Sequence, residues 1–192
     1  MTFYFLPEEL CDWKGPGRMV HVAPKTLKEV FDSIIYIGRT TKTIKKAENL
    51  VNLMKKEFAR LEKQKLKTKP RVYMEKWPVP PMASGNWVPE LVEIAGGIPV
   101  IAQSGKPSAE FAFAKLQKAD PDVMIFHWCG YGERFNKSLV TERPCWSELK
   151  AVKQNKLFVI DDSLLNRPSP RLVEGIKAMQ KILTDYSRSC GM

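Results

Sequence analysis

The sequence predicts a three-layer α/β lobe with a mostly parallel sheet, preceded by one long helix. Three observations support this fold class. After residue 70, segments of strand character alternate with segments of helical periodicity, as in parallel sheets covered by helices on both faces. The near-continuous apolar run at 122–128 is typical of a strand buried on both sides. Apolar residues recur in steps of three and four through 41–65, which indicates a long amphipathic helix.

In the N-terminal third, a short strand is expected at 19–23, closed by Pro24. Thr26 and Glu29 form a capping box for a helix that Gly38 should end. The long helix at 41–65 should bury one stripe of side chains, namely Ile44, Ala47, Val51, Met54, Phe58 and Leu61. Its exposed faces should carry lysines such as Lys45, Lys55, Lys56 and Lys63.

The segments after Pro70 complete the sheet and its covering helices. We expect parallel strands at 71–77, 98–102, 122–128 and 156–161. We expect helices at 87–95, 108–119, 145–154 and 172–183. Ligands of such sheets bind beyond the carboxyl ends of the strands. The loops that could bind a ligand are therefore those at 78–86, 130–143 and 162–170.

Composition excludes several classes of protein. With 192 residues, 44% hydrophobic and 27% charged, the chain is globular rather than disordered or fibrous. No apolar run approaches the roughly 18 residues that a membrane span needs, and no secretory signal is visible at the start. The four cysteines lie far apart without a CxxC pair, which argues against a zinc site or a disulfide scaffold.

The net charge of +10 is concentrated in one segment. Eleven basic and three acidic residues lie between Arg39 and Lys69, which gives this segment a charge of +8. Such a run is typical of a solvated helix face. Nucleic acid is not an expected partner, because the aromatic residues that usually accompany nucleic-acid binding are almost missing there. The alternative function is a basic interaction module that has kept the fold but lost ligand binding, and that would bind nucleic acid or an acidic partner through the face from Arg39 to Lys69.

Aromatic residues stand at the loops where a ligand is expected. Trp77 and Trp87 bracket the first loop, Trp128 and Tyr131 belong to the second, and Arg167 lies on the Pro-stiffened third. The rings could form flat apolar walls, although the tryptophans would serve equally well as core residues. The turn at 84–86 could offer its backbone N–H groups to a polar or anionic group.

The sequence gives little support to catalysis or metal binding. His127 and Cys129 are separated by one residue, which does not let them face each other as a nucleophile and base must, and no second pair of metal ligands accompanies them. Asp161 and Asp162 have no partner carboxylate at short spacing, so helix capping is the simpler interpretation. No phosphate-binding or dinucleotide fingerprint occurs. We therefore expect no enzyme, no catalytic residue and no resident cofactor.

Three strings of the sequence carry a family resemblance. GNWVPELVEIAGGIPVIAQSGKPS, DPDVMIFHWCGYGERF and RPSPRLVEG occur in this order. Together they resemble the C-terminal lobe of the cobalamin-binding type of class III substrate-binding proteins of ABC importers. This Fe/B12 family also carries ferric siderophores and haem.

The resemblance implies two α/β lobes joined by one rigid inter-lobe helix, with a corrinoid such as cobalamin in the cleft between them. On this basis 1–37 is a remnant of the first lobe, 38–69 the connecting helix and 70–192 the C-terminal lobe. Haem or a ferric siderophore is the alternative ligand. The positions that it places nearest the ligand are Trp77, Trp87, Trp128, Tyr131 and Arg167.

The resemblance also bears on partners and location. It implies an ABC permease, and a first lobe that a separate chain or a homo-oligomer would supply. The family docks through an acidic residue that aligns near Ala114 and Lys115, where this chain has no carboxylate; Glu110 lies about one turn away. Family members are extracytoplasmic, whereas the chain as written would be cytoplasmic.

Overall fold

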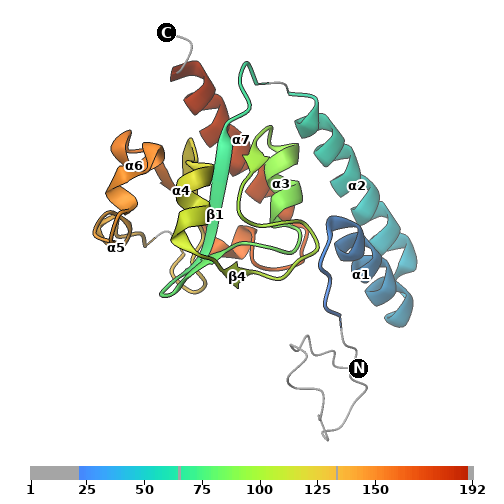
Figure 1. Cartoon of the computed structure of the whole chain (residues 1–192). Helices are drawn as coiled ribbons and strands as arrows, with labels where there is room; N and C mark the ends of the chain where they lie inside the picture. The colour runs from blue at the N-terminus through green and yellow to red at the C-terminus, as the bar shows by residue number, and fades with distance from the viewer. Residues whose placement is uncertain (1–21, 65, 133, 190–192) are drawn as a thin grey trace, which may run out of the picture.

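The computed structural model describes residues 22–64, 66–132 and 134–189 (Figure 1). Of the strand expected at 19–23, residues 19–21 lie outside this description and residues 22–23 are not in a strand. Among the described residues, no helix is both long and apolar enough to cross a membrane.

The sheet is mixed but mostly parallel, as its sequence pattern predicts. Its strands are β1 (Arg71–Pro78), β2 (Pro81–Ala83), β3 (Ile98–Pro99), β4 (Ala109–Glu110), β5 (Val123–Phe126) and β6 (Leu157–Val159). The order is β4-β2-β1-β5-β6, and β3 also pairs with β1. The pairs β1–β3, β1–β5 and β5–β6 are parallel, whereas β2 pairs antiparallel with both β1 and β4.

Helices cover both faces, which gives the three layers. One face is covered by α1 (Leu27–Thr40), α2 (Ile44–Glu62), α3 (Val88–Ile94) and α7 (Leu172–Ser189). The other is covered by α4 (Phe113–Ala119), α5 (Ser138–Thr141) and α6 (Lys150–Lys153). Two 3-10 turns, Trp146–Glu148 and Asp162–Leu164, complete the connections.

Strand β5 shows how one sequence serves two cores. Its side chains alternate between the faces, so Val123 and Ile125 join the core under α2, α3 and α7. Met124 and Phe126 join the core under α4 to α6. All four are fully buried, which explains why the run reads as continuously apolar in the sequence.

The long helix is slightly shorter than expected, and the boundary before it was wrong. Helix α2 begins at Ile44 and ends at Glu62 rather than covering 41–65. Gly38 does not end the preceding helix, because α1 continues to Thr40. A Cβ on Gly38 would overlap that of Ala47, so this glycine instead allows α1 and α2 to pack closely.

The expected packing of α2 is confirmed. Ala47, Val51, Met54, Phe58 and Leu61 are buried and Ile44 is half-buried. The four lysines named for its outer faces, Lys45, Lys55, Lys56 and Lys63, are all exposed.

Several other elements differ from the sequence prediction. The strand expected at 98–102 is reduced to β3, and the segment at 108–119 starts with β4 before α4 begins. The expected helix at 145–154 is a 3-10 turn followed by the single turn α6. The loop expected at 78–86 contains β2, which folds back on the end of β1 as a hairpin. The physical reason is shared: these segments are fixed by pairing and packing with distant residues rather than by their own periodicity.

Candidate functional site

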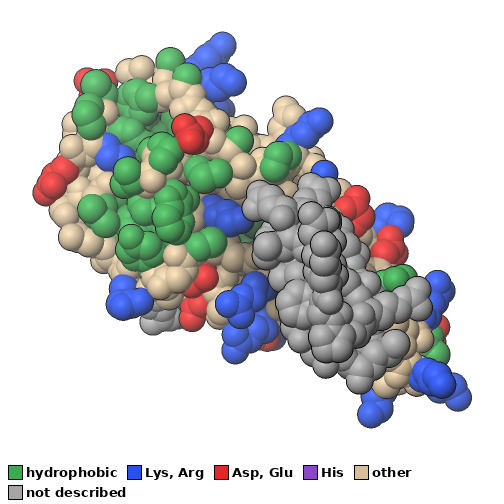
Figure 2. Space-filling model, turned by 90° about the horizontal axis from the view of Figure 1, so that it is seen from below, with side chains coloured by type: hydrophobic (Ala, Val, Ile, Leu, Met, Phe, Trp, Pro, Cys, Tyr) green, Lys and Arg blue, Asp and Glu red, His purple; other side chains and the backbone are tan. Residues whose placement is uncertain are grey.

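The carboxyl edge of the parallel strands gathers the three loops expected to bind a ligand. β1 ends in Trp77 and Pro78, and β5 is followed by His127, Trp128 and the loop beyond them. β6 leads into the turn that begins at Asp162. Seen from this edge, the molecule presents a broad cluster of hydrophobic side chains (Figure 2).

An aromatic cluster forms the centre of this edge. The rings of Trp77 and Tyr131 meet edge to face with centroids 6.5 Å apart, and Tyr131 meets Trp128 at 5.5 Å. Phe135 lies 5.3 Å from Trp128 and stacks on Phe126 at 4.8 Å. Trp77 is 39% exposed and Tyr131 is 37% exposed, whereas Trp128 is buried. Two solvent-facing rings therefore rest on a packed aromatic base.

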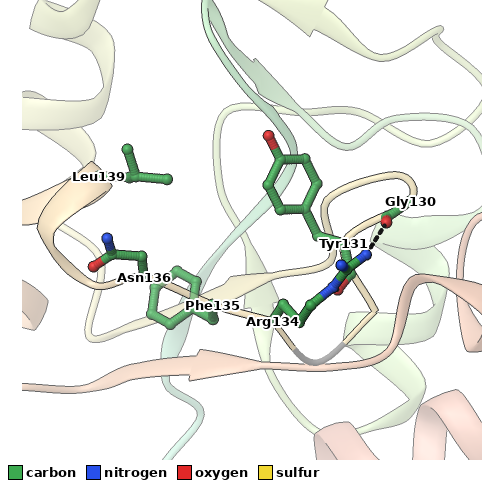
Figure 3. A pocket seen from close by; sticks show the side chains of 6 residues that line it. All are labelled: Gly130, Tyr131, Arg134, Phe135, Asn136 and Leu139. Carbon is green, nitrogen blue, oxygen red and sulfur yellow. Dashed lines mark hydrogen bonds between the residues drawn. The ribbon is translucent and has the colours of Figure 1, made fainter.

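Beside these rings lies an open hollow of about 500 Å³. Tyr131, Phe135 and Leu139 give it apolar walls, and its other lining residues are Gly130, Arg134 and Asn136 (Figure 3). The Arg134 guanidinium donates to the Gly130 carbonyl at 3.1 Å, which folds this side chain along the loop. The hollow is therefore mostly apolar, with one cation and one amide at its rim.

A second hollow of about 360 Å³ adjoins the first. Leu139 lines both, and Pro78, Val79, Phe111 and Phe113 are among the other residues of the second. Val79 is 74% exposed and Leu139 is 43% exposed. The two hollows and the exposed rings make one apolar surface, and clustered exposed apolar residues are a common feature of binding sites on soluble proteins.

Underneath this surface lies a buried ion pair. Glu75 is fully buried, and its carboxylate accepts two hydrogen bonds from Arg143, at 2.8 and 2.9 Å. Tyr73 donates to the same carboxylate at 2.8 Å and the Trp128 indole at 2.9 Å. Burial raises the pKa of Glu75, and the Arg143 guanidinium opposes this by favouring the charged form.

Arg143 connects the ion pair to the hairpin and to the second hollow. Its guanidinium also donates to the Pro78 carbonyl at 2.9 Å and lies 4.3 Å from the centroid of the Trp146 ring. Sequence analysis missed this pair, since 68 positions separate its members. The only signal was a glutamate that directly follows the run Val72–Met74 in strand β1, because buried carboxylates need a partner.

His127 and Cys129 do not form a catalytic pair. Asn166 lies between them: its Oδ1 is 2.7 Å from His127 Nδ1, and its Nδ2 donates to Cys129 Sγ at 3.0 Å. Burial lowers the pKa of His127 to about 4, so the ring is neutral near pH 7, and burial also raises the pKa of Cys129. A thiol with a raised pKa is a poor nucleophile.

The acidic residues of the third loop have structural roles, as capping predicts. Asp162 accepts hydrogen bonds from the Gly130 and Gly132 amides, at 3.3 and 3.2 Å, and so ties the third loop to the second. Asp161 accepts from the Ser163 amide at 2.8 Å.

The turn at 84–86 is not an anion site, contrary to the sequence interpretation. Its three amides donate within the protein, Ser84 to the Met74 carbonyl, Gly85 to the Ser108 hydroxyl and Asn86 to the Lys106 carbonyl. No N–H group of this turn is left for a ligand.

The structure brings three of the five expected site residues together. Trp77, Trp128 and Tyr131 form one cluster, and Arg167 is exposed on the third loop. Trp87 lies in the core on the opposite face of the sheet, where its indole donates to the Leu165 carbonyl at 2.9 Å. Direct ligand contact of these residues stays a prediction. Phe135, Leu139 and Arg134 line the hollow but were not singled out, because nothing in their local pattern marks them.

The chain is similar in sequence to two named bacterial proteins. A vitamin B12-binding protein of Vibrio cholerae is 22% identical over 177 residues, which are 89% of this chain and 62% of that protein. An ABC transporter substrate-binding lipoprotein of Bacillus subtilis, YvrC, is 27% identical over 164 residues, covering 81% of this chain and 50% of that protein. The chain thus spans less than two thirds of the length of these relatives.

Solved structures share the fold. An ABC transporter substrate-binding protein of Listeria monocytogenes superposes with a TM-score of 0.76 at 22% identity, covering 88% of this chain and 68% of the other. S. aureus IsdE complexed with heme gives 0.71 at 23% identity, with the same coverage. The Vibrio cholerae vitamin B12-binding protein BtuF gives 0.64 at 18%, covering 89% and 66%.

The family model described as periplasmic binding protein matches residues 19–164, which include helices α1 to α6 and strands β1 to β6. Together with the mostly parallel three-layer lobe and its apolar carboxyl edge, this match shows that the chain belongs to the periplasmic binding protein family.

Proposed function

We propose that this chain is the substrate-binding component of an ABC-type importer and that it binds a corrinoid such as cobalamin at its carboxyl edge. The observation that carries the proposal is the continuous apolar surface formed by Trp77, Tyr131 and the hollow of about 500 Å³ beside them. A flat macrocycle with a large apolar body needs a surface of this kind, because its affinity comes mainly from the apolar area removed from water.

The residues of this edge would have different roles in binding the ligand. Trp77 and Tyr131 present exposed ring surface against which the macrocycle could pack. Arg134 and Asn136, at the rim of the hollow, could meet polar groups on the periphery of the ligand. Trp128 and Phe135 support the exposed rings from below, and the buried Glu75 fixes Trp128 by accepting its indole N–H.

We propose binding rather than catalysis, since the groups nearest this edge are unsuited to activating a nucleophile. Cys129 has a raised pKa, and Asn166 separates it from a neutral His127. The relatives support the coarser class of ligand: one is named for vitamin B12, and IsdE is complexed with heme. An ABC permease is the partner that this class of protein implies.

A titration with cyanocobalamin, followed by absorbance and calorimetry, tests the proposal. The described edge offers one wall to the ligand, so we expect saturable but weak binding. Trp77→Ala and Tyr131→Ala should each weaken it by about 1–3 kcal/mol. Tyr36→Ala is the matched control, because Tyr36 is an aromatic residue of similar exposure, 46%, on the remote helix α1.

The same titration with haemin and with a ferric siderophore tests the two alternative ligands. Saturation by haemin alone, with the same loss in the two site variants, would move the proposal from a corrinoid to haem. Absence of heat and of spectral change with all three ligands, or equal weakening by the Tyr36 control, would contradict binding at this edge.

A further inference from the structure

The basic charge of the chain forms a surface on the side of α2 that faces away from the core. All basic residues between Arg39 and Lys69 that the structure describes with side chains are exposed. Helix α2 packs against α1, α3 and α7 through its buried stripe, and its outer side lies at the rim of the molecule (Figure 1). Most of this charge is therefore presented to solvent around the outer sides of α2.

Three lysines mark a straight line along this surface. At 100° per residue, Lys45, Lys56 and Lys63 point within about 25° of one another. They span 18 residues, or roughly 27 Å of helix at 1.5 Å per residue. We name these three residues the α2 lysine strip. Asn49 and Asn52 occupy neighbouring exposed positions and add no negative charge.

The acidic residues of α2 lie off this line. Glu48 is about 60° away around the helix axis, and Glu57 and Glu62 are about 100° away or more. Glu57 is also neutralised, because Arg60 donates to it at 2.9 Å. The side chain of Leu53, beside the strip, is 63% exposed although it is aliphatic. The apolar stripe of α2 is buried in the protein, so only its basic side and Leu53 are available to a surface outside, and clustered lysines are attracted to anionic headgroups.

We propose that α2 docks the protein on an anionic lipid surface through the α2 lysine strip. Lysine ammonium groups act as point charges that suit a fluid array of phosphate headgroups, whereas bidentate recognition of individual phosphates would favour arginine. A nucleic-acid partner fits less well, because the single aromatic residue of α2, Phe58, is buried and none is left for base stacking.

Docking through α2 is compatible with an open ligand site. The strip belongs to the helical layer on one face of the sheet, whereas the aromatic base of the hollow lies in the core on the other face. Both surfaces can be occupied at once. The inference is independent of the proposed ligand, since no residue of the hollow contributes to the strip.

Vesicle flotation with the full chain tests this inference. Vesicles of phosphatidylcholine with about 30% phosphatidylglycerol should retain the chain at low salt and release it as ionic strength rises. The triple variant Lys45→Gln, Lys56→Gln, Lys63→Gln should bind roughly a hundredfold more weakly, at about fivefold for each lysine near an anionic surface. Circular dichroism should show unchanged helix content, because all three side chains are exposed.

The matched control removes the same charge elsewhere. Lys115, Lys118 and Lys153 are exposed on α4 and α6, across the sheet, and their triple change to Gln should weaken binding less than about threefold. Equal loss in both triples would show that net charge alone acts, and equal retention by pure phosphatidylcholine would exclude an electrostatic dock. Stronger retention by a DNA duplex through the same lysines would assign the strip to nucleic acid. Each of these results would overturn the proposal.

Discussion

On one face of the sheet, the long helices α1, α2 and α7 pack mostly aliphatic side chains into one regular core. On the other face, short helical turns cover aromatic rings and a buried ion pair, and both hollows open near that face. The first core comes from stripes that recur within each helix. The second depends on contacts between residues far apart in the chain, which hold irregular loops in one geometry.

The two faces are stabilised in different ways. Periodic helices need no polar network, because hydrogen bonds within each helix satisfy the backbone. The loops beyond the strands lack that regularity, so side chains such as Glu75 and Asp162 must satisfy and connect them. Substitutions on each face separate these two sources of stability.

Arg143→Met should destabilise the aromatic face most. The change leaves the Glu75 carboxylate buried with only the Tyr73 and Trp128 donors, and we expect the free energy of unfolding to fall by about 3–5 kcal/mol. Urea unfolding at pH 7 measures it. The double variant with Glu75→Leu should recover part of the loss, because no uncompensated charge then stays buried. Additive losses would mean that the two side chains do not act as a pair.

Phe58→Ala probes the aliphatic face. Phe58 is 6% exposed and its ring lies 5.7 Å from that of Phe31, so a cavity should lower the free energy of unfolding by about 3–4 kcal/mol. The same urea experiment measures it, with the exposed Leu53→Ala as the control on the same helix. A loss below about 1 kcal/mol would show that α2 contributes little to this core.

Acid should weaken the protein through His127. In the folded protein the pKa of His127 is about 4, below its ordinary value of 6.5. Between these pH values, His127 therefore binds a proton in the unfolded chain but not in the folded one. Stability is therefore complete above pH 6.5 and falls by about 3 kcal/mol as pH drops toward 4. Unfolding measured from pH 7 to pH 4 should show a shallower decline for His127→Leu. Parallel profiles for the two proteins would contradict this assignment.

The smallest expected effect is a difference in stability between variants of two buried tryptophans. The Trp128 indole donates to the charged Glu75, whereas that of Trp87 donates to the neutral Leu165 carbonyl. Both rings are nearly buried, so Trp→Phe removes similar shape at each. Trp128→Phe should reduce thermal stability more than Trp87→Phe, by about 1 kcal/mol, because hydrogen bonds to charged groups are stronger. Equal changes in melting temperature would show that the ion pair does not strengthen the bond.

The elements whose apolar residues follow a helix or strand pattern within their own sequence were predictable. The stripe from Val51 to Leu61 and the run that became β5 required no knowledge of the rest of the chain. Hairpin β1–β2 was missed because the Pro-rich sequence of β2 resembles a loop, and only its pairing with β1 and β4 makes it a strand of the sheet.

The sequence predicted which edge of the sheet carries the candidate site, but only some of the residues that form it. Alternation along the chain places Phe126 and Trp128 on one face, and the exposed ring of Tyr131 packs against Trp128. The burial of Trp87 could not be read from its position before a helix, since it depends on Leu165, 78 residues away. Arg143 and Leu139 carry no local mark, because only the folded chain brings them to the hollows.

Leu139 stands where the two hollows meet and is bounded by solvent on its remaining side. A single substitution at this position changes the size of a side chain that lines both hollows. A smaller side chain here would widen both hollows and a larger one would narrow them, because Leu139 lines each. Since Leu139 is 43% exposed, such a change would alter the shape of the carboxyl edge with little effect on either core.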